Sequence, residues 1–130
     1  MKIFNKGGEW SSKVNFIDEN NVVLGYDTTQ WCCEHAGWFI ADIVKKDVDF
    51  WGNDTLNTEQ IIDLPGFNFD PTFFMQIDTE NHSLDEGRMV IFRVVNSSEE
   101  RFVHLFNVHN GYYGHGFEFE CPGNEREGIL

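Results

Sequence analysis

The chain has 130 residues, a length that suits one domain able to bury a core without disulfides or metal ions. Its 22 acidic residues against nine basic ones give a net charge of -13. This charge argues against binding to nucleic-acid backbones or to anionic membranes, because both need clustered Lys and Arg. A hydrophobic share of 41% is too high for a disordered chain.

The sequence shows no targeting signal. Residues 1–8 lack the apolar segment of a signal peptide, and no apolar run approaches the roughly 18 residues of a membrane span. An odd number of cysteines, three, favours a reducing compartment. We therefore expect a cytoplasmic protein of one domain, with its core at about residues 12–120 and a polar, frayed tail at residues 121–130.

Strand-forming residues dominate the chain in order. Residues 13–17 and 22–26 are β-branched and aromatic, and the turn cluster 18–21 between them predicts a hairpin. Residues 38–44 predict the next strand. A short helix is expected from Asn57 or Thr58 to Leu64, with Gln60 as a capping-box partner of Asn57. Four further strands are expected at residues 72–78, 88–95, 101–108 and 112–120. The fold class predicted is mainly β (α+β), an antiparallel meander with one short helix.

The last predicted hairpin turns at Asn110-Gly111, the strongest two-residue hairpin signal. With that turn, His104 and His115 become diagonal neighbours on one face, about 7–8 Å apart at the backbone. The same face carries a nearly continuous aromatic and aliphatic set, so we expect it to form the core. That set is Phe102, His104, Phe106, Val108, Tyr113, His115, Phe117 and Phe119.

The most unusual stretch of the chain begins with Gln30, Trp31, Cys32, Cys33 and Glu34. Thiolates and imidazoles bind zinc, and these residues with His104 and His115 form a conceivable set, but adjacent cysteines match no standard zinc spacing. The competing interpretation is that both cysteines pack as small buried hydrophobes and that the histidines satisfy themselves by hydrogen bonds. A Cys32–Cys33 disulfide is not expected, because adjacent residues meet disulfide geometry only with strain.

Catalytic patterns are missing. The surroundings of Cys32 and Cys33 are acidic and aromatic, which does not favour a thiolate nucleophile. The acids lie mostly in turns, and no metalloprotease, EF-hand or phosphate-loop pattern occurs. We therefore expect no enzyme, no catalytic residues, no resident metal and no cofactor. Ten acids without any Lys or Arg lie between residues 47 and 87, and they form a strongly negative face if folding gathers them.

Aromatic residues beside turns are enriched at protein interfaces. Tyr112 and Tyr113 follow the Asn110-Gly111 turn, so the tip of that hairpin is a candidate binding surface. Together with the unusual stretch it gives a set of candidate binding residues: Cys32, Cys33, Glu34, Tyr112, Tyr113 and His115.

Two segments carry a resemblance. Residues 30–34 are similar to a Gln-Asp-Cys-Cys-Glu signature, and residues 110–114 followed by Phe117-Glu118-Phe119 are similar to an Asn-Gly-Tyr-Tyr-Ser signature. Together they resemble a small domain of unknown function found mainly in bacteriophages and prophages. The chain departs from that pattern with Trp31 in place of an Asp and with His35-Ala36-Gly37 after Glu34. The resemblance implies a viral or prophage origin and a bacterial cytoplasm, and it implies no activity.

Three functional hypotheses remain open. The first is a phage-type accessory protein that acts by binding a basic host protein, without direct contact to nucleic acid or membrane. The second is a small-ligand or metal-binding module built on Cys32, Cys33, Glu34, His104 and His115. The third is that both motifs only stabilise the fold and that function lies elsewhere on the surface.

Overall fold

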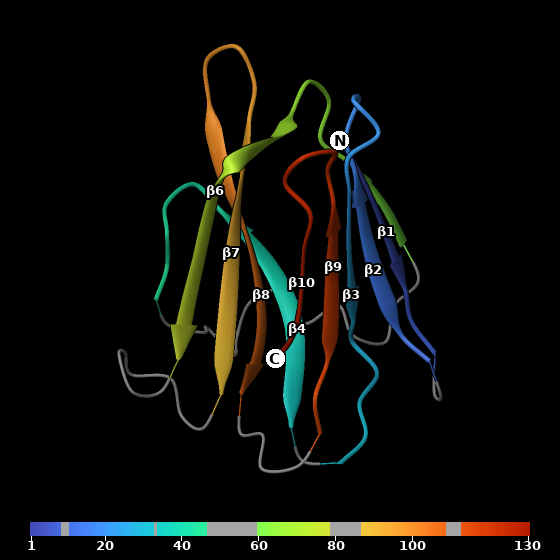
Figure 1. Ribbon diagram of the computed structural model, residues 1–130. Coiled ribbons are helices and arrows are strands. Elements are labelled where there is room, and N and C mark those ends of the chain that lie inside the picture. Colours follow the sequence, from blue (N-terminus) through green and yellow to red (C-terminus); the bar gives the residue numbers. More distant parts are fainter. Residues whose placement is uncertain (9–10, 33, 47–59, 79–86, 109–112) are drawn as a thin grey trace.

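The computed structural model describes residues 1–8, 11–32, 34–46, 60–78, 87–108 and 113–130. Within those ranges it contains ten strands in two antiparallel sheets and no helix (Figure 1). The expectation of a mainly β protein is therefore confirmed. No helix in this part of the chain has the length and apolarity needed to cross a membrane.

The first sheet has six strands, and we call it sheet A. Its order is β10-β9-β3-β2-β1-β5, and every neighbouring pair is antiparallel. The strands are β1 (Lys2–Lys6), β2 (Lys13–Ile17), β3 (Val23–Asp27), β5 (Gln60–Asp63), β9 (Gly116–Glu120) and β10 (Arg126–Ile129).

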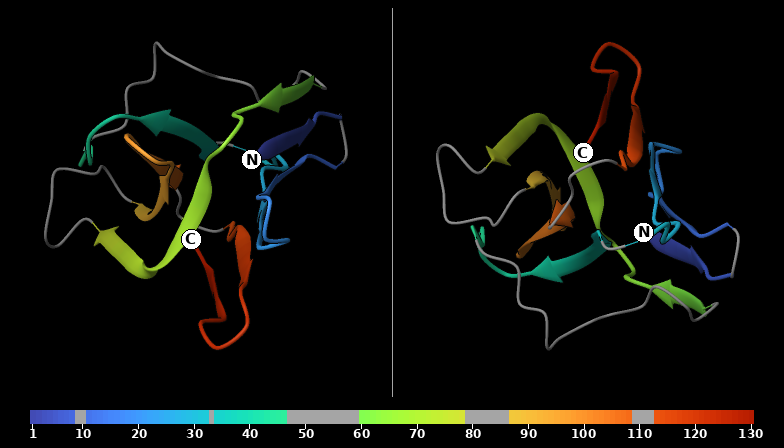
Figure 2. Two further views of the ribbon diagram at one scale, coloured as in Figure 1. Left: turned by 90° about the horizontal axis from the view of Figure 1, so that it is seen from above. Right: turned by 90° about the horizontal axis from the view of Figure 1, so that it is seen from below.

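The second sheet, sheet B, has the order β4-β8-β7-β6. Its strands are β4 (His35–Ala41), β6 (Asn68–Asp78), β7 (Arg88–Val95) and β8 (Glu100–Val108). Strand β6 changes register between Asp70 and Phe74, where Pro71 cannot donate a ladder hydrogen bond. Seen along the strands, the two sheets face each other as the layers of a sandwich (Figure 2).

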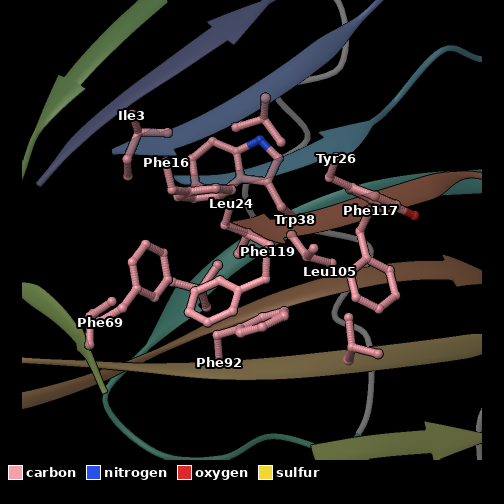
Figure 3. Packing of buried hydrophobic residues seen from close by; sticks show 14 of the residues in the cluster. Ile3, Phe16, Leu24, Tyr26, Trp38, Phe69, Phe92, Leu105, Phe117 and Phe119 are labelled. Carbon is pink, nitrogen blue, oxygen red and sulfur yellow. The ribbon is translucent and has the colours of Figure 1, made fainter. Parts of the chain in front are cut away.

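The space between the sheets is filled by aromatic and aliphatic side chains from both layers. Phe16 and Phe117 of sheet A meet Trp38, Phe92 and Leu105 of sheet B (Figure 3). The ring of Phe16 lies edge-on to that of Trp38, with centroids 5.2 Å apart. Alternation explains the layering, because β9 buries every second residue and exposes the others.

Sheet B buries apolar residues on its outer face as well. Phe39, Met89, Ile91, Phe102 and Phe106 form part of a second cluster on that face. This is why β7 and β8 read as nearly continuous apolar runs rather than as alternating ones. The predicted core face of β8 is buried, but Phe102, Phe106 and Val108 pack in the second cluster. The other face of β8 is buried as well, because Val103 and Leu105 pack between the sheets.

The predicted helix is wrong within the described residues, because Gln60–Asp63 forms β5 and pairs with β1. The residues 57–59 expected to begin that helix lie outside the description. Two apolar residues in a row, Ile61 and Ile62, fit a strand whose faces differ: Ile61 is exposed and Ile62 packs against the core. Tertiary pairing has overridden a local capping signal.

The tail is ordered, contrary to expectation. Arg126–Ile129 pairs with β9 as β10, and Leu130 is buried. At the other terminus β1 was not predicted, and Met1 and Ile3 are buried. Both ends of the chain therefore contribute to the sandwich.

The final hairpin was also predicted wrongly. β8 pairs with β4 and β7 in sheet B, whereas β9 pairs with β3 and β10 in sheet A. His104 and His115 are therefore in different layers and are not cross-strand neighbours. The turn at Asn110-Gly111 lies outside the described residues.

Candidate functional site

The loop between β3 and β4 contains the first motif and is held by its own polar side chains. The Glu34 Oε1 atom accepts hydrogen bonds from the backbone N–H groups of Trp31 at 2.7 Å and Cys32 at 3.1 Å. The Gln30 side-chain amide donates to the carbonyl oxygens of Cys32, at 3.2 Å, and Glu34. Glu34 is buried, so this carboxylate orders the loop from inside.

Cys32 is not a buried free cysteine, as the core-packing interpretation expected. Its side chain is exposed, and it is disulfide-bonded, so no free thiol is present there for packing or for a metal. The placement of Cys33 lies outside the described residues. Cys121 is a free, buried cysteine packed in the core between the sheets.

The segment that leads into β9 carries the second motif. Of its residues, Tyr112 lies outside the description, whereas Tyr113 is 43% exposed. The Tyr113 carbonyl oxygen accepts a hydrogen bond of 3.0 Å from the Asn107 side-chain amide. Asn107 itself is fully buried near the end of β8 and also donates to the Leu130 carbonyl oxygen at 3.0 Å.

The fold brings the two motifs together, because the loop that leads into β4 and the residues 113–115 that lead into β9 lie at the same end of the sandwich (Figure 1). There the start of β4 pairs with the end of β8, with His35 opposite Val108 and Ala36 opposite Asn107. The His115 Nδ1 atom lies 2.8 Å from the Asp27 carbonyl oxygen, which ties the second segment to the end of β3. We call this region the motif end.

Tyr26 links the two layers beneath the motif end. Its hydroxyl donates a hydrogen bond of 2.7 Å to the Phe106 carbonyl oxygen, and its ring lies 6.4 Å from that of His115. Burial, and then the charge of Asp27, raise the pKa of Tyr26 well above its ordinary value. The hydroxyl therefore stays a donor at every physiological pH.

Four buried polar atoms have no hydrogen-bond partner in the described structure: Thr28 Oγ1, Glu34 Oε2, Asn107 Oδ1 and His115 Nε2. Three are acceptors by geometry. The Asn107 amide nitrogen is engaged with two carbonyls, so its oxygen is the free atom. His115 Nδ1 faces a carbonyl oxygen and must donate a proton to it, so in the neutral ring the lone pair is on Nε2. Such atoms can accept hydrogen bonds from water or from a ligand.

His104 does not belong to this region. Its ring is fully buried and stacked on Phe39 at 4.2 Å, Nδ1 lies 3.0 Å from the Phe102 carbonyl oxygen, and Nε2 accepts from the Lys45 N–H at 3.0 Å. Burial lowers the pKa of His104 to about 4. The histidine is thus neutral and satisfied, as the competing core interpretation expected.

The metal-ligating set is therefore not assembled from the described residues. No group of three or more His, Cys, Asp or Glu side chains suited to a metal occurs among them. Glu34 and His115 both belong to the motif end, whereas His104 lies on the other face of sheet B. The acidic segment 47–87 lies mostly outside the description, so its predicted negative face stays a prediction.

The sequence did not indicate three features of the surface and its support. Two of them are Asn107 and Tyr26, whose buried side chains donate hydrogen bonds to backbone carbonyls at or near the motif end. Neither residue lies in an unusual sequence pattern. A groove beside β10 was missed because residues 121–130 were expected to fray. The signal for that strand was weak: Arg126, Glu127, Gly128 and Ile129 alternate in charge and size without β-branched enrichment.

No protein-family model, curated protein or solved structure matches this chain. Function must therefore be argued from the residues themselves.

Proposed function

We propose that this protein is an accessory protein of the phage or prophage type that acts by binding a basic host protein in the bacterial cytoplasm, without catalysis. The observation that carries the proposal is the exposure of Trp31, at 57%, and Tyr113, at 43%, on two adjoining segments of the motif end. Trp and Tyr are the side chains most enriched among residues that dominate binding energy.

Hydrogen bonds to the backbone of Trp31 and Tyr113 favour an ordered binding surface. Glu34 fixes the backbone of Trp31, and Asn107 fixes that of Tyr113. A surface ordered before contact loses less conformational entropy on binding.

Charge indicates the kind of partner. A net charge of -13 attracts a basic protein over a range set by salt and repels nucleic acid. The resemblance of residues 30–34 and 110–114 to a phage-associated domain is consistent with a host target.

The test compares variants that differ in one exposed apolar side chain. Trp31→Ala removes the proposed anchor, and Ile61→Ala removes another exposed apolar residue, 70% accessible, on the far edge strand of sheet A. Each tagged protein is purified from the bacterial host at low salt and analysed by native mass spectrometry. We expect one basic protein to co-purify with the wild type and with Ile61→Ala, and its affinity to fall by about 2 kcal/mol, roughly thirtyfold, in Trp31→Ala.

Two results contradict the proposal. One is a partner whose affinity is the same for Trp31→Ala and for the wild type. The other is a partner whose affinity does not fall as salt rises, since an electrostatic interaction must weaken.

The second candidate is a small-ligand or metal-binding module at Glu34 and His115. The free acceptor atoms Glu34 Oε2 and His115 Nε2 favour it. A bound ion or small molecule should then appear in the native mass of protein purified without chelator. It should be lost in Glu34→Gln, while an apo mass removes this candidate.

A further inference from the structure

A groove of about 420 Å³ runs beside β10, the edge strand of sheet A. Residues 125–130 line one side of it, and Phe74 and Gln76 of β6 and Arg88 of β7 line the other. The ring of Phe117 contributes to the lining from β9. In the axial views the β9–β10 hairpin projects from the sandwich with β10 on the side nearer β6 (Figure 2).

Among the described strands β10 pairs with β9 alone, so its other edge has no strand of the described chain beside it and can form hydrogen bonds. A free edge can accept an extended segment as an additional strand, whose affinity comes from main-chain hydrogen bonds. The four residues of β10 span about 13 Å at roughly 3.3 Å per residue. An incoming segment of about four to five residues therefore matches it.

The groove contains two arginines without an acidic partner in the described part of the chain. Of the four arginines in the chain, Arg93 pairs with Asp70 and Glu100, and Arg101 pairs with Glu99. Arg88 and Arg126 form no ion pair with any described residue, although both line the groove that Glu125 and Glu127 also line. The Arg126 guanidinium lies 4.5 Å from the centre of the Phe74 ring. An unpaired guanidinium facing a groove is suited to a carboxylate.

The register of β10 separates its charges by face. Arg126 is opposite the buried Phe119 and therefore points inward, whereas Glu127 is opposite the exposed Glu118 and points outward. Residues directly opposite each other on neighbouring strands share a face. A strand added beside β10 is thus complementary when its acidic residues point inward and its basic residues point outward.

A second copy of this chain does not meet that requirement through antiparallel pairing of two β10 strands. The inward charge of β10 is Arg126, and its outward charge is Glu127. Because opposed residues share a face, no register of such a pair sets an acid against a base. The partner must carry the inverse pattern.

From this geometry we propose that β10 binds an extended segment of a partner protein as an added strand, with acidic residues facing Arg88 and Arg126 and basic residues facing Glu127. This site lies beyond the function proposed above and does not depend on Trp31. Opposite charges alternating along the segment are its recognition pattern.

The test uses two fluorescein-labelled peptides of identical composition and zero net charge. In one, Lys and Glu alternate between flanking threonines, and in the other the Lys and Glu residues form two blocks. Equal net charge cancels the general attraction to a protein of charge -13. We expect the alternating peptide to bind at least tenfold more tightly in fluorescence anisotropy. We also expect amide hydrogen exchange to slow at Arg126–Ile129.

Variants assign the binding to the groove. Arg126→Gln and Arg88→Gln should each weaken binding of the alternating peptide at least fivefold, while Arg126→Lys retains part of it. Arg101→Gln is the matched control, because this arginine is paired with Glu99 outside the groove. Melting temperatures verify that each variant is folded.

The proposal is wrong if the block peptide binds as tightly as the alternating one, or if binding leaves exchange at β10 unchanged. It is also wrong if the Arg101→Gln and Arg126→Gln variants lose affinity equally. Concentration-dependent dimerisation that protects β10 would show a second copy as the occupant instead. Any of these results leaves the function proposed for the motif end untouched.

Discussion

His104 is a neutral histidine in a fully buried position, and each ring nitrogen lies within hydrogen-bond distance of a backbone group. Protonation would place a charge beside Phe39 and would remove the acceptor that the Lys45 N–H uses. Folding therefore lowers the pKa of His104 from 6.5 to about 4. An unfolded chain binds this proton more readily than the folded one between those two values.

We predict an acid-sensitive stability from this one side chain. Its contribution is fully present above pH 6.5, and about 3 kcal/mol is lost as pH falls through the interval to about 4. Urea unfolding at pH 7.5 and pH 5 measures the part of the loss between these values, about 2 kcal/mol. In His104→Gln, which keeps a donor and an acceptor but does not titrate, the difference between the two pH values should shrink. An unchanged difference would place the acid sensitivity in other groups.

Among the elements, the β2–β3 hairpin owes its shape to Asp18. The Oδ1 atom accepts from the N–H groups of Asn20 and Val22, both at 2.9 Å, and Oδ2 accepts from Phe69 N–H at 2.9 Å. Asn21 adopts a positive φ of 61°, which the turn requires. The same carboxylate thus shapes a turn in sheet A and fastens β6 of sheet B to it.

Two substitutions separate those roles. Asp18→Ala leaves three N–H groups without their acceptor and should lower the free energy of unfolding by about 3 kcal/mol. Asp18→Asn keeps one oxygen for the turn but presents an amide N–H₂ to Phe69, so it should cost about half as much. Urea denaturation measures both, with the exposed Asn20→Ala as a control expected within about 0.5 kcal/mol. Equal losses for Ala and Asn would mean that the two hydrogen bonds to the turn contribute nothing beyond the link to β6, and no loss for Asn would mean that the link contributes nothing.

Local pattern predicted those elements whose residues alternate or cluster strongly. β2 was predicted with its observed bounds, Lys13–Ile17, as was β7, Arg88–Val95, because β-branched, aromatic and other apolar residues make up most of both. β5 and β10 were not predicted, since each is short and becomes a strand through its neighbour β1 or β9. A polar residue such as Glu127 carries no strand preference until that partner is in place.

Strand pairs between residues far apart in the sequence were harder to predict than the strands themselves. A meander is the simplest arrangement of consecutive strands, and β6, β7 and β8 follow it. The chain then changes sheets between β8 and β9, so Phe117 pairs with Tyr26, a residue far away in sequence. Both faces of β8 are apolar, so alternation could not reveal which one faces sheet A.

At the scale of the whole molecule, the motif end exists because β3 is followed by a strand of sheet B and β8 by a strand of sheet A, and both changes of sheet fall at the same end of the sandwich. Sequence alone grouped Glu34, Tyr113 and His115 as candidate binding residues, although Glu34 belongs to the first motif and the other two lie in or beside the second. It argued against a disulfide between the adjacent cysteines, whereas Cys32 is disulfide-bonded. It also could not find Asn107, because a buried Asn is recognised only by the carbonyls that it meets. The hydrogen bonds of Glu34 within its own loop also agree with the hypothesis that the motif only stabilises the fold. The binding test with Trp31→Ala and Ile61→Ala separates the two hypotheses.

The whole molecule also carries far more negative than positive charge. Among the described residues, only Arg93 and Arg101 neutralise acids through ion pairs, and Glu118 stands directly opposite Glu127 on neighbouring strands. Compact folding concentrates these like charges, so self-repulsion opposes it. Salt screens the repulsion at distances beyond about 10 Å at 0.1 M.

We therefore predict that stability and partner binding respond to salt in opposite directions. Raising NaCl from about 10 mM to about 500 mM should raise the melting temperature by roughly 3–6 °C, which corresponds to about 1 kcal/mol. Over the same range the basic partner should dissociate more readily. Calorimetry and anisotropy on one preparation measure the two effects, and Glu118→Gln, which removes one opposed charge, should reduce the thermal gain. A melting temperature that falls with salt would show that ion pairs outweigh repulsion, and the acidic surface would then need another explanation than attraction of a basic partner.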